Sequence, residues 1–264
     1  MFFMDSDDLI TKTAFEELYA VAKNFQADVV QCEKFYQFPA EIKLKDIENF
    51  SLTPVSYPNI KFVDAPTLIT DNLEERISDW LQRKFLWTNW TQLIRRDFIV
   101  ESRLKFTNCF AQDRIMTCCL VLSAKKYVRV PNVINFYRIV ENSASHKKRT
   151  PQDALNTHIN TTVQGFQYIN KFLSGHEFFQ QHPDLKYAVL EHSILDLFYY
   201  LAEIYDKIPL SQLYDIACTE FEKAEDKSDL AALFFGRMNF FNVHLIKQQQ
   251  IIQQLQAQLQ ALQK

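Results

Sequence analysis

The sequence predicts an α/β fold followed by an all-helical C-terminal region. A short apolar run, residues 1–4, leads directly into the acidic cluster 5–8 (DSDD), as expected for a buried strand that ends in a polar turn. Helical spacing over 13–25 then precedes a β-rich stretch at 27–38, which gives the order strand, turn, helix, strand. From residue 151 onward nearly every segment has helical period.

The α/β elements can be assigned in chain order. Thr13 and Glu16 have the spacing of a capping box and predict the start of the first helix. Residues 39–65 contain several prolines and mixed polarity, which indicates an irregular segment with one short strand near 60–63. Thr70 or Asp71 is expected to cap the next helix. The remaining predictions are a helix over 72–86, a strand at 91–94, a short helix from 97, an apolar helix over 114–124, and strands at 127–130 and 133–137.

The C-terminal part predicts helices over 152–174, 184–206, 209–224 and 228–262. We therefore expect three regions: 1–146, a helical domain over 147–240, and an amphipathic Gln-rich helix over 241–264. In that last helix Leu245, Ile252 and Leu259 recur every seven residues, which is a short coiled-coil-like pattern. Homo-oligomerisation through 241–264 and packing of this helix on its own domain are both open at this point.

Composition excludes several classes of protein. The chain has 264 residues, 47% hydrophobic, and a net charge of −3, so broad electrostatic binding of nucleic acid is not expected. Five cysteines without a CxxC pair indicate free thiols in a reducing cytoplasm. No apolar run approaches the ~18 residues of a membrane span. The first four residues are too short, and their flank too acidic, for a signal peptide. Only three glycines are present, and no Gly-rich phosphate loop.

The acidic cluster is the first candidate site. Asp5 and Asp7 follow the predicted strand at its C-terminal end, where open α/β sheets bind their ligands. Mg²⁺ is bound by one or two carboxylates together with substrate phosphates, and two such carboxylates at i and i+2 can turn toward one point. A solvated acidic turn before the next helix is the alternative reading of the same residues.

Three further groups carry side chains suited to chemistry. Residues 87–96 (WTNWTQLIRR) offer aromatic faces for sugars and arginines for carboxylate or phosphate, or else core tryptophans with surface arginines. Asp113 begins an apolar helix and could act as a general base or simply stabilise the helix start. Arg138 and the loop 142–149 could close over phosphates or form a solvated connector.

Taken together, these blocks resemble the second half of the catalytic domain of bacterial family 2 glycosyltransferases, which have the Rossmann-like GT-A fold. MFFMDSDDLI with FEELYAVAKNFQADVV is similar to that family's strand, DxD metal motif, helix and next strand. WTQLIRRDFIVESRLKF resembles its W-x-K-L-x-R-R-D-F stretch, and FAQDRIMTCCLVLSAKKYVRVPNVINFYRIVENSAS resembles its acidic helix, strand pair and closing segment. The resemblance covers residues 1–146 and implies a partial GT-A mixed sheet.

The resemblance implies an inverting hexosyltransferase. Asp5 and Asp7 would hold Mn²⁺ or Mg²⁺ on the diphosphate of a UDP-linked sugar, and Asp113 would deprotonate the acceptor hydroxyl. The positions matching the family's binding residues are Asp5, Arg138, Ser143 and His146 for the donor, and Trp90 and Gln112 for the acceptor. The acceptor would be a bacterial surface glycan or glycolipid, such as lipopolysaccharide or capsule. The enzyme would be cytoplasmic, with peripheral contact at the inner face of the membrane.

The chain also departs from the family pattern. Gln92 and Gln112 stand where the family usually has Lys and Glu, and the family's first half has no counterpart. We therefore expect that Met1 is not the natural start and that the first strand exposes an edge. A catalytically inactive scaffold remnant is the alternative function. A dehalogenase-type phosphatase is disfavoured because the acidic turn lacks the Thr or Val of that motif, and an EF-hand because Ile10 replaces its glycine.

Overall fold

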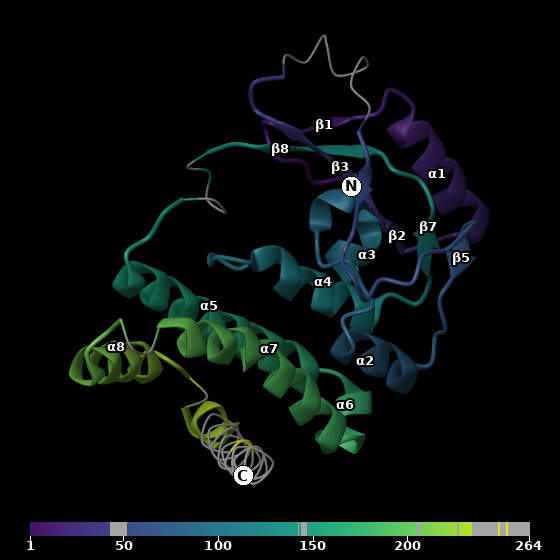
Figure 1. Ribbon diagram of the computed structural model, residues 1–264. Coiled ribbons are helices and arrows are strands. Elements are labelled where there is room, and N and C mark those ends of the chain that lie inside the picture. The colour runs from purple at the N-terminus through teal and green to yellow at the C-terminus, as the bar shows by residue number, and fades with distance from the viewer. Residues whose placement is uncertain are drawn as a thin grey trace, which may run out of the picture.

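The computed structural model describes residues 1–42, 52–141, 143, 147–204, 207–225, 227–233, 248 and 252. The chain has a mixed α/β fold, as predicted, with helices gathered in its C-terminal part (Figure 1). The strands are β1 (Leu9–Ile10), β2 (Val29–Cys32), β3 (Phe35–Pro39), β4 (Pro54–Val55), β5 (Thr67–Leu68), β6 (Gln92–Ile94), β7 (Tyr127–Val130) and β8 (Asn135–Ile139). The helices are α1 (Ala14–Phe25), α2 (Leu73–Leu81), the 3₁₀ helix η2 (Asn89–Thr91), α3 (Arg96–Glu101), α4 (Gln112–Ser123), α5 (Pro151–Ser174), α6 (Glu177–Gln181), α7 (Pro183–Ile204) and α8 (Leu210–Glu222).

The strands form two small mixed sheets. One has the order β5-β7-β2-β6, with β2 and β7 parallel and both outer strands antiparallel to their neighbours. The other has the order β1-β8-β3-β4, with only β3 and β8 parallel. The parallel pairs join segments about 100 residues apart in sequence, so the two halves of the α/β region fold together.

The apolar N-terminal run is not the buried strand that the sequence predicts. Phe2 makes a single antiparallel bridge to Leu93, and Ile94 donates its backbone N–H to the Met1 carbonyl at 2.8 Å. Met1 and Met4 are about half exposed. The run therefore lies along the outer edge of β6, but a single bridge is too little pairing to make it a strand.

Several other boundaries differ from the sequence-based expectations. The β-rich stretch 27–38 is two strands, because the chain passes from one sheet to the other between Cys32 and Phe35. Residues 60–63 form no strand; β4 lies within the irregular segment instead, and β5 follows it. The helix predicted over 72–86 ends at Leu81, and α6 was not predicted at all.

Of the two predicted helix caps, Thr13 lies at the predicted position but lacks the capping bond, and the cap predicted for α2 is wrong. The Thr13 side chain makes no capping bond to the backbone and contacts the Glu17 carboxylate instead. The cap of α2 is Asn72, whose Oδ1 accepts from the backbone N–H groups of Glu74 at 2.9 Å and Glu75 at 3.2 Å. Helix α1 thus begins after the predicted residue, whereas the cap of α2 lies one residue beyond the predicted Asp71.

The sheet β5-β7-β2-β6, called the first sheet below, lies between two hydrophobic layers. Val29 faces the larger core, which α2 and α4 build, whereas Val30 faces α1 on the other side. The larger core continues from α4 into α5 and α7, which pack against each other (Figure 1). The C-terminal helices thus share a core with the α/β part. The proposed boundaries at 146/147 and 240/241 stay predictions.

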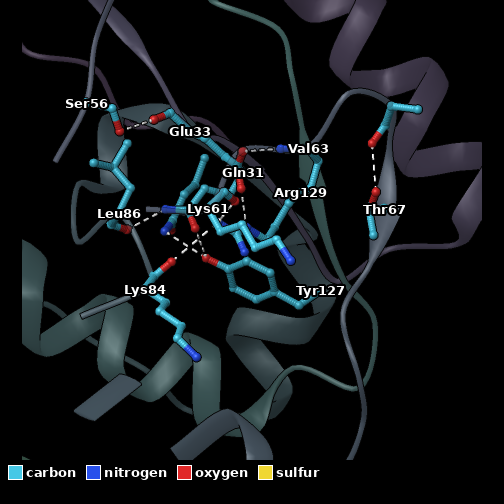
Figure 2. A network of polar contacts seen from close by, with 12 residues as sticks. Gln31, Glu33, Ser56, Lys61, Val63, Thr67, Lys84, Leu86, Tyr127 and Arg129 are labelled. Atoms are coloured by element: carbon cyan, nitrogen blue, oxygen red, sulfur yellow. Dashed lines mark hydrogen bonds and ion pairs between the residues drawn. The ribbon is translucent and has the colours of Figure 1, made fainter. Parts of the chain in front are cut away.

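A buried polar network holds the irregular segment 52–65 against the sheet (Figure 2). Glu33 forms an ion pair with Arg129 and accepts from the backbone N–H of Val63 at 2.8 Å, while its carbonyl accepts from Ser56 at 2.6 Å. Arg129 also donates to the Lys61 carbonyl at 2.8 Å. Three hydrogen bonds, at Ser56, Lys61 and Val63, thus hold a segment that has little regular structure of its own.

Three sequence-based expectations can be checked only in part. All five cysteines are free, in agreement with the expected thiols. In the part of the chain that the structure describes, no helix combines the length and apolarity needed to cross a bilayer. The coiled-coil-like segment 241–264 lies outside the described residues, apart from Gln248 and Ile252.

Candidate functional site

The acidic turn lies at the carboxyl edge of the first sheet. Residues 1–2 run antiparallel to β6, which is itself antiparallel to β2, so the N-terminal run points the same way as the parallel strands β2 and β7. Asp5 and Asp7 follow it at the surface. This edge is where open α/β sheets bind ligands, and the structure puts the predicted carboxylates there.

Asp8 is the buried member of the turn, and sequence analysis did not single it out. Its side chain is 4% exposed, and its Oδ1 accepts from the backbone N–H of Arg138 at 2.9 Å. Its Oδ2 is buried and has no hydrogen-bond partner among the described residues. Burial, with the neighbouring carboxylates of Asp5 and Asp7, raises the pKa of Asp8 to about 6.

Asp113 comes to the same site from a distant part of the chain. Asp113 lies in the first turn of α4, which begins directly after Ala111. The φ of Ala111 is 58°, in the left-handed region, and this backbone conformation sets the direction in which the helix starts. Burial and then the Asp5 carboxylate raise the pKa of Asp113 to about 6, while a hydrogen bond from the Asn89 backbone acts in the opposite direction. Asp5 and Asp113 are therefore close enough to repel each other. A carboxylate with a pKa in this range can exchange a proton near neutral pH.

Arg138 ties β8 to the acidic turn. Besides the backbone bond to Asp8, its Nε donates to the Asp7 carbonyl at 3.0 Å and its Nη1 to the Ala40 carbonyl at 3.2 Å. The guanidinium also lies 4.7 Å from the centre of the Phe38 ring. The sequence predicts that Arg138 binds the donor, and in the structure Arg138 contacts the turn that is predicted to bind the metal.

The two neighbouring tryptophans have different surroundings. Trp90 is 9% exposed and stacks on Tyr137 at 5.5 Å, with Phe35 edge-on at 4.8 Å. Trp87 is 37% exposed and stacks on Tyr57 at 5.9 Å. The predicted acceptor role of Trp90 stays a prediction, but Trp87 is the tryptophan with an open face.

The other predicted site residues are not brought to the acidic turn by any described contact. Gln112 is exposed in a shallow depression that α5 and α8 also line, next to Asn160 and Glu220. Ser143 is half-buried and donates its backbone N–H to the Val140 carbonyl at 3.3 Å. His146 lies outside the described residues. Arg95, one of the paired arginines, binds Asp28 through two bonds at 2.9 and 3.0 Å and so has a structural partner.

The residues of the acidic turn fit a divalent cation that also binds phosphates. Among the described residues no group of three or more His, Cys, Asp or Glu side chains is arranged to hold a metal by itself. Mg²⁺ commonly takes only one or two carboxylates and completes its shell with water and substrate phosphates. The buried Asp8 Oδ2 without a partner, and the repulsion among Asp5, Asp7 and Asp8, are features that a bound cation would relieve.

The chain is thus a mixed α/β protein with a cluster of carboxylates at the carboxyl edge of one sheet. No protein-family model matches the sequence. The chain is 27% identical over 167 residues to a cholesterol galactosyltransferase of Borreliella burgdorferi, an alignment that covers 59% of this chain and 43% of that protein. The chain thus spans less than half the length of this curated relative. The crystal structure of residues 1–349 of S. aureus TarS has a similar fold, with a TM-score of 0.50, 16% identity, and coverage of 87% of this chain and 57% of that one.

Proposed function

We propose that this chain is the catalytic part of an inverting glycosyltransferase that moves a sugar from a UDP-linked donor to a hydroxyl of an acceptor. The observation that carries the proposal is the approach of Asp5 to Asp113: the two residues are 108 positions apart in the sequence, yet the Asp5 carboxylate raises the pKa of Asp113. The sequence likeness to a cholesterol galactosyltransferase supports this class of reaction.

In the proposed reaction, Asp113 accepts the proton of the acceptor hydroxyl. The acceptor oxygen attacks the anomeric carbon, the bond from that carbon to the diphosphate oxygen breaks, and its electron pair leaves with the nucleoside diphosphate. Mn²⁺ or Mg²⁺ bound by Asp5 and Asp7 would neutralise charge on the leaving diphosphate. Asp5, Arg138, Ser143 and His146 are proposed to hold the donor, and Trp90 and Gln112 to contact the acceptor.

The acceptor is proposed to be a glycolipid or surface glycan that the enzyme meets at the inner face of the cell membrane. The relative's name makes cholesterol a first acceptor to assay. Lipopolysaccharide and capsule precursors are the next candidates, in line with the family that the sequence resembles.

Replacing Asp113 tests the proposal. Asp113→Asn keeps the size of the side chain but removes the base, so sugar transfer should fall by at least about a hundredfold. Binding of UDP-sugars with Mn²⁺, measured as a rise in melting temperature, should be nearly unchanged. Asp184→Asn is the matched control because Asp184 is an exposed carboxylate in the first turn of another helix, α7.

Two results would count against this function. Equal loss of transfer and donor binding in Asp113→Asn would make Asp113 a structural residue or a metal ligand. If no nucleotide-sugar raises the melting temperature of the unmodified chain, it is not an active transferase, and the scaffold alternative would stand.

A further inference from the structure

An apolar cavity of about 500 Å³ lies between α4, α5 and α7. It falls in the range of ligand pockets, about 300–1,000 Å³. Most of its wall is aliphatic or aromatic, including Trp80, Phe85, Ile115, Ile169 and Val189. A sugar in such a space would leave its hydroxyl groups without partners, whereas an apolar group would fill it without that cost.

The helix that carries the proposed base, α4, also lines the cavity, although Asp113 itself is not one of the lining residues. Ala111, Arg114 and Cys118 of α4 line it, and Asp113 lies in the same first turn of that helix. Trp87 also lines the cavity, and its carbonyl accepts from Thr117 of α4 at 3.0 Å. Asn89, two residues further on, is the residue whose backbone bonds to Asp113. Residues 87–89 therefore contact both the cavity, through Trp87, and the proposed base Asp113, through the Asn89 backbone.

The cavity walls are shaped by small and polar residues on α5. At Gly165 a Cβ atom would come within 2.9 Å of Ile115 Cδ1, so the glycine makes room where α4 and α5 approach. The Thr161 hydroxyl faces this region, is buried, and has no hydrogen-bond partner among the described residues. The ionised lining side chains described are the guanidiniums of Arg83 and Arg114, and burial lowers the pKa of Arg114 to about 10.

We propose that this cavity binds the apolar body of an amphiphilic acceptor and so presents the acceptor hydroxyl to Asp113. The inference rests on the proposed function and adds the substrate class to it. Tyr57 and Trp87 line the cavity, stack on each other and are each 37% exposed, so they would contact the acceptor where it leaves the cavity. Both a fused-ring alcohol and an acyl-chain lipid have the required chemistry, and the assay below separates them.

Filling the cavity tests the proposal. Thr161→Phe places a ring in the cavity without touching Asp113 or the acidic turn, and Thr161→Val is the control that removes the hydroxyl at constant volume. Sugar transfer to cholesterol and to dioleoylglycerol, each in detergent micelles, is compared with hydrolysis of the donor by water. We expect Thr161→Phe to lose at least about tenfold in transfer to whichever amphiphile is used, with donor hydrolysis within about twofold of the unmodified chain. Thr161→Val should retain transfer.

A binding measurement keeps the test independent of catalysis. Trp80 and Trp87 line the cavity, so their fluorescence should be quenched saturably by energy transfer to dehydroergosterol or to a pyrene-labelled acyl chain. Thr161→Phe should abolish that signal. Unchanged amphiphile transfer in Thr161→Phe, or the absence of saturable quenching by both probes in the unmodified chain, would overturn this proposal. Thermal stabilisation by a UDP-sugar would still report the proposed function separately.

Discussion

At the scale of single residues, the acidic turn combines one buried and two surface carboxylates. Burial of the ionised Asp8 carboxylate lowers the free energy of unfolding. Its pKa of about 6 lies above the ordinary value of 3.8, and this difference corresponds to at most about 3 kcal/mol. The folded chain holds this proton more tightly than the unfolded chain does. The ionisation of Asp8 therefore lowers stability as pH rises from about 4 to about 6, and the full cost is present at pH 7.

We predict that Asp8→Asn raises the melting temperature of the metal-free protein at pH 7.5. The amide oxygen can still accept from the Arg138 backbone, while the desolvated charge and its repulsion by Asp5 and Asp7 are removed. The gain should shrink as pH is lowered toward 4, where the native carboxyl is already neutral. Calorimetry in EDTA at several pH values measures this difference in melting temperature, with Asp184→Asn as a control. A melting temperature at pH 7.5 no higher than that of the unmodified chain would contradict this account.

At the scale of elements, the starts of helices show how sequence and structure differ. Thr13 and Asn72 are both good capping residues, but only Asn72 bonds to its helix backbone. The spacing of Thr13 and Glu16 matches a capping box, and the predicted helix is present. Its first turn is set instead by the bond from the Ala14 N–H to the Thr11 carbonyl, which follows from how the chain leaves β1.

Asn72→Ala should destabilise the fold by about 1 kcal/mol because it leaves the N–H groups of Glu74 and Glu75 without their acceptor. Thr13→Ala should have a much smaller effect, since no backbone bond is lost. Urea unfolding of both variants measures the difference. Equal losses in the two variants would show that the caps contribute in a way their hydrogen bonds do not explain.

At the scale of the whole molecule, the α/β part and the C-terminal helices share one hydrophobic core. Phe166 of α5 is fully buried in that core, together with residues of α2, α4 and the sheet. The proposed acceptor cavity lies between these same elements, so its shape depends on how the two parts pack.

The two parts should unfold in one transition. All three tryptophans precede residue 147, so their fluorescence reports the α/β part, whereas far-UV circular dichroism is dominated by the helices. Phe166→Ala should lower stability by about 3–5 kcal/mol and shift both signals together. Tyr187→Ala, at a side chain that is 43% exposed on α7, is the control and should have a small effect. Separate transitions for the two signals would show that the helical part folds as an independent domain.

Some features of this protein were determined by local sequence patterns. The mixed α/β class, most helices and the two strands β7 and β8 follow from the spacing of apolar residues, which depends only on helical and strand geometry. The order of the acidic turn, Asp113 and Arg138 was enough to predict that they belong to one site. In the structure Asp8 accepts a hydrogen bond from the Arg138 backbone, and the Asp5 carboxylate raises the pKa of Asp113; that these residues form one catalytic site stays a prediction.

Only the tertiary structure decided which side chains are buried and what they surround. Asp8 looks like its neighbours in the sequence, yet it is the buried carboxylate because β8 covers it. Trp87 and Trp90 are equivalent in sequence pattern, but one opens onto a cavity and the other packs in an aromatic cluster. The cavity is formed by residues from several elements distant in sequence, and no local pattern records it. Burial depends on contacts between segments about 100 residues apart, which is why it could not be inferred from spacing alone.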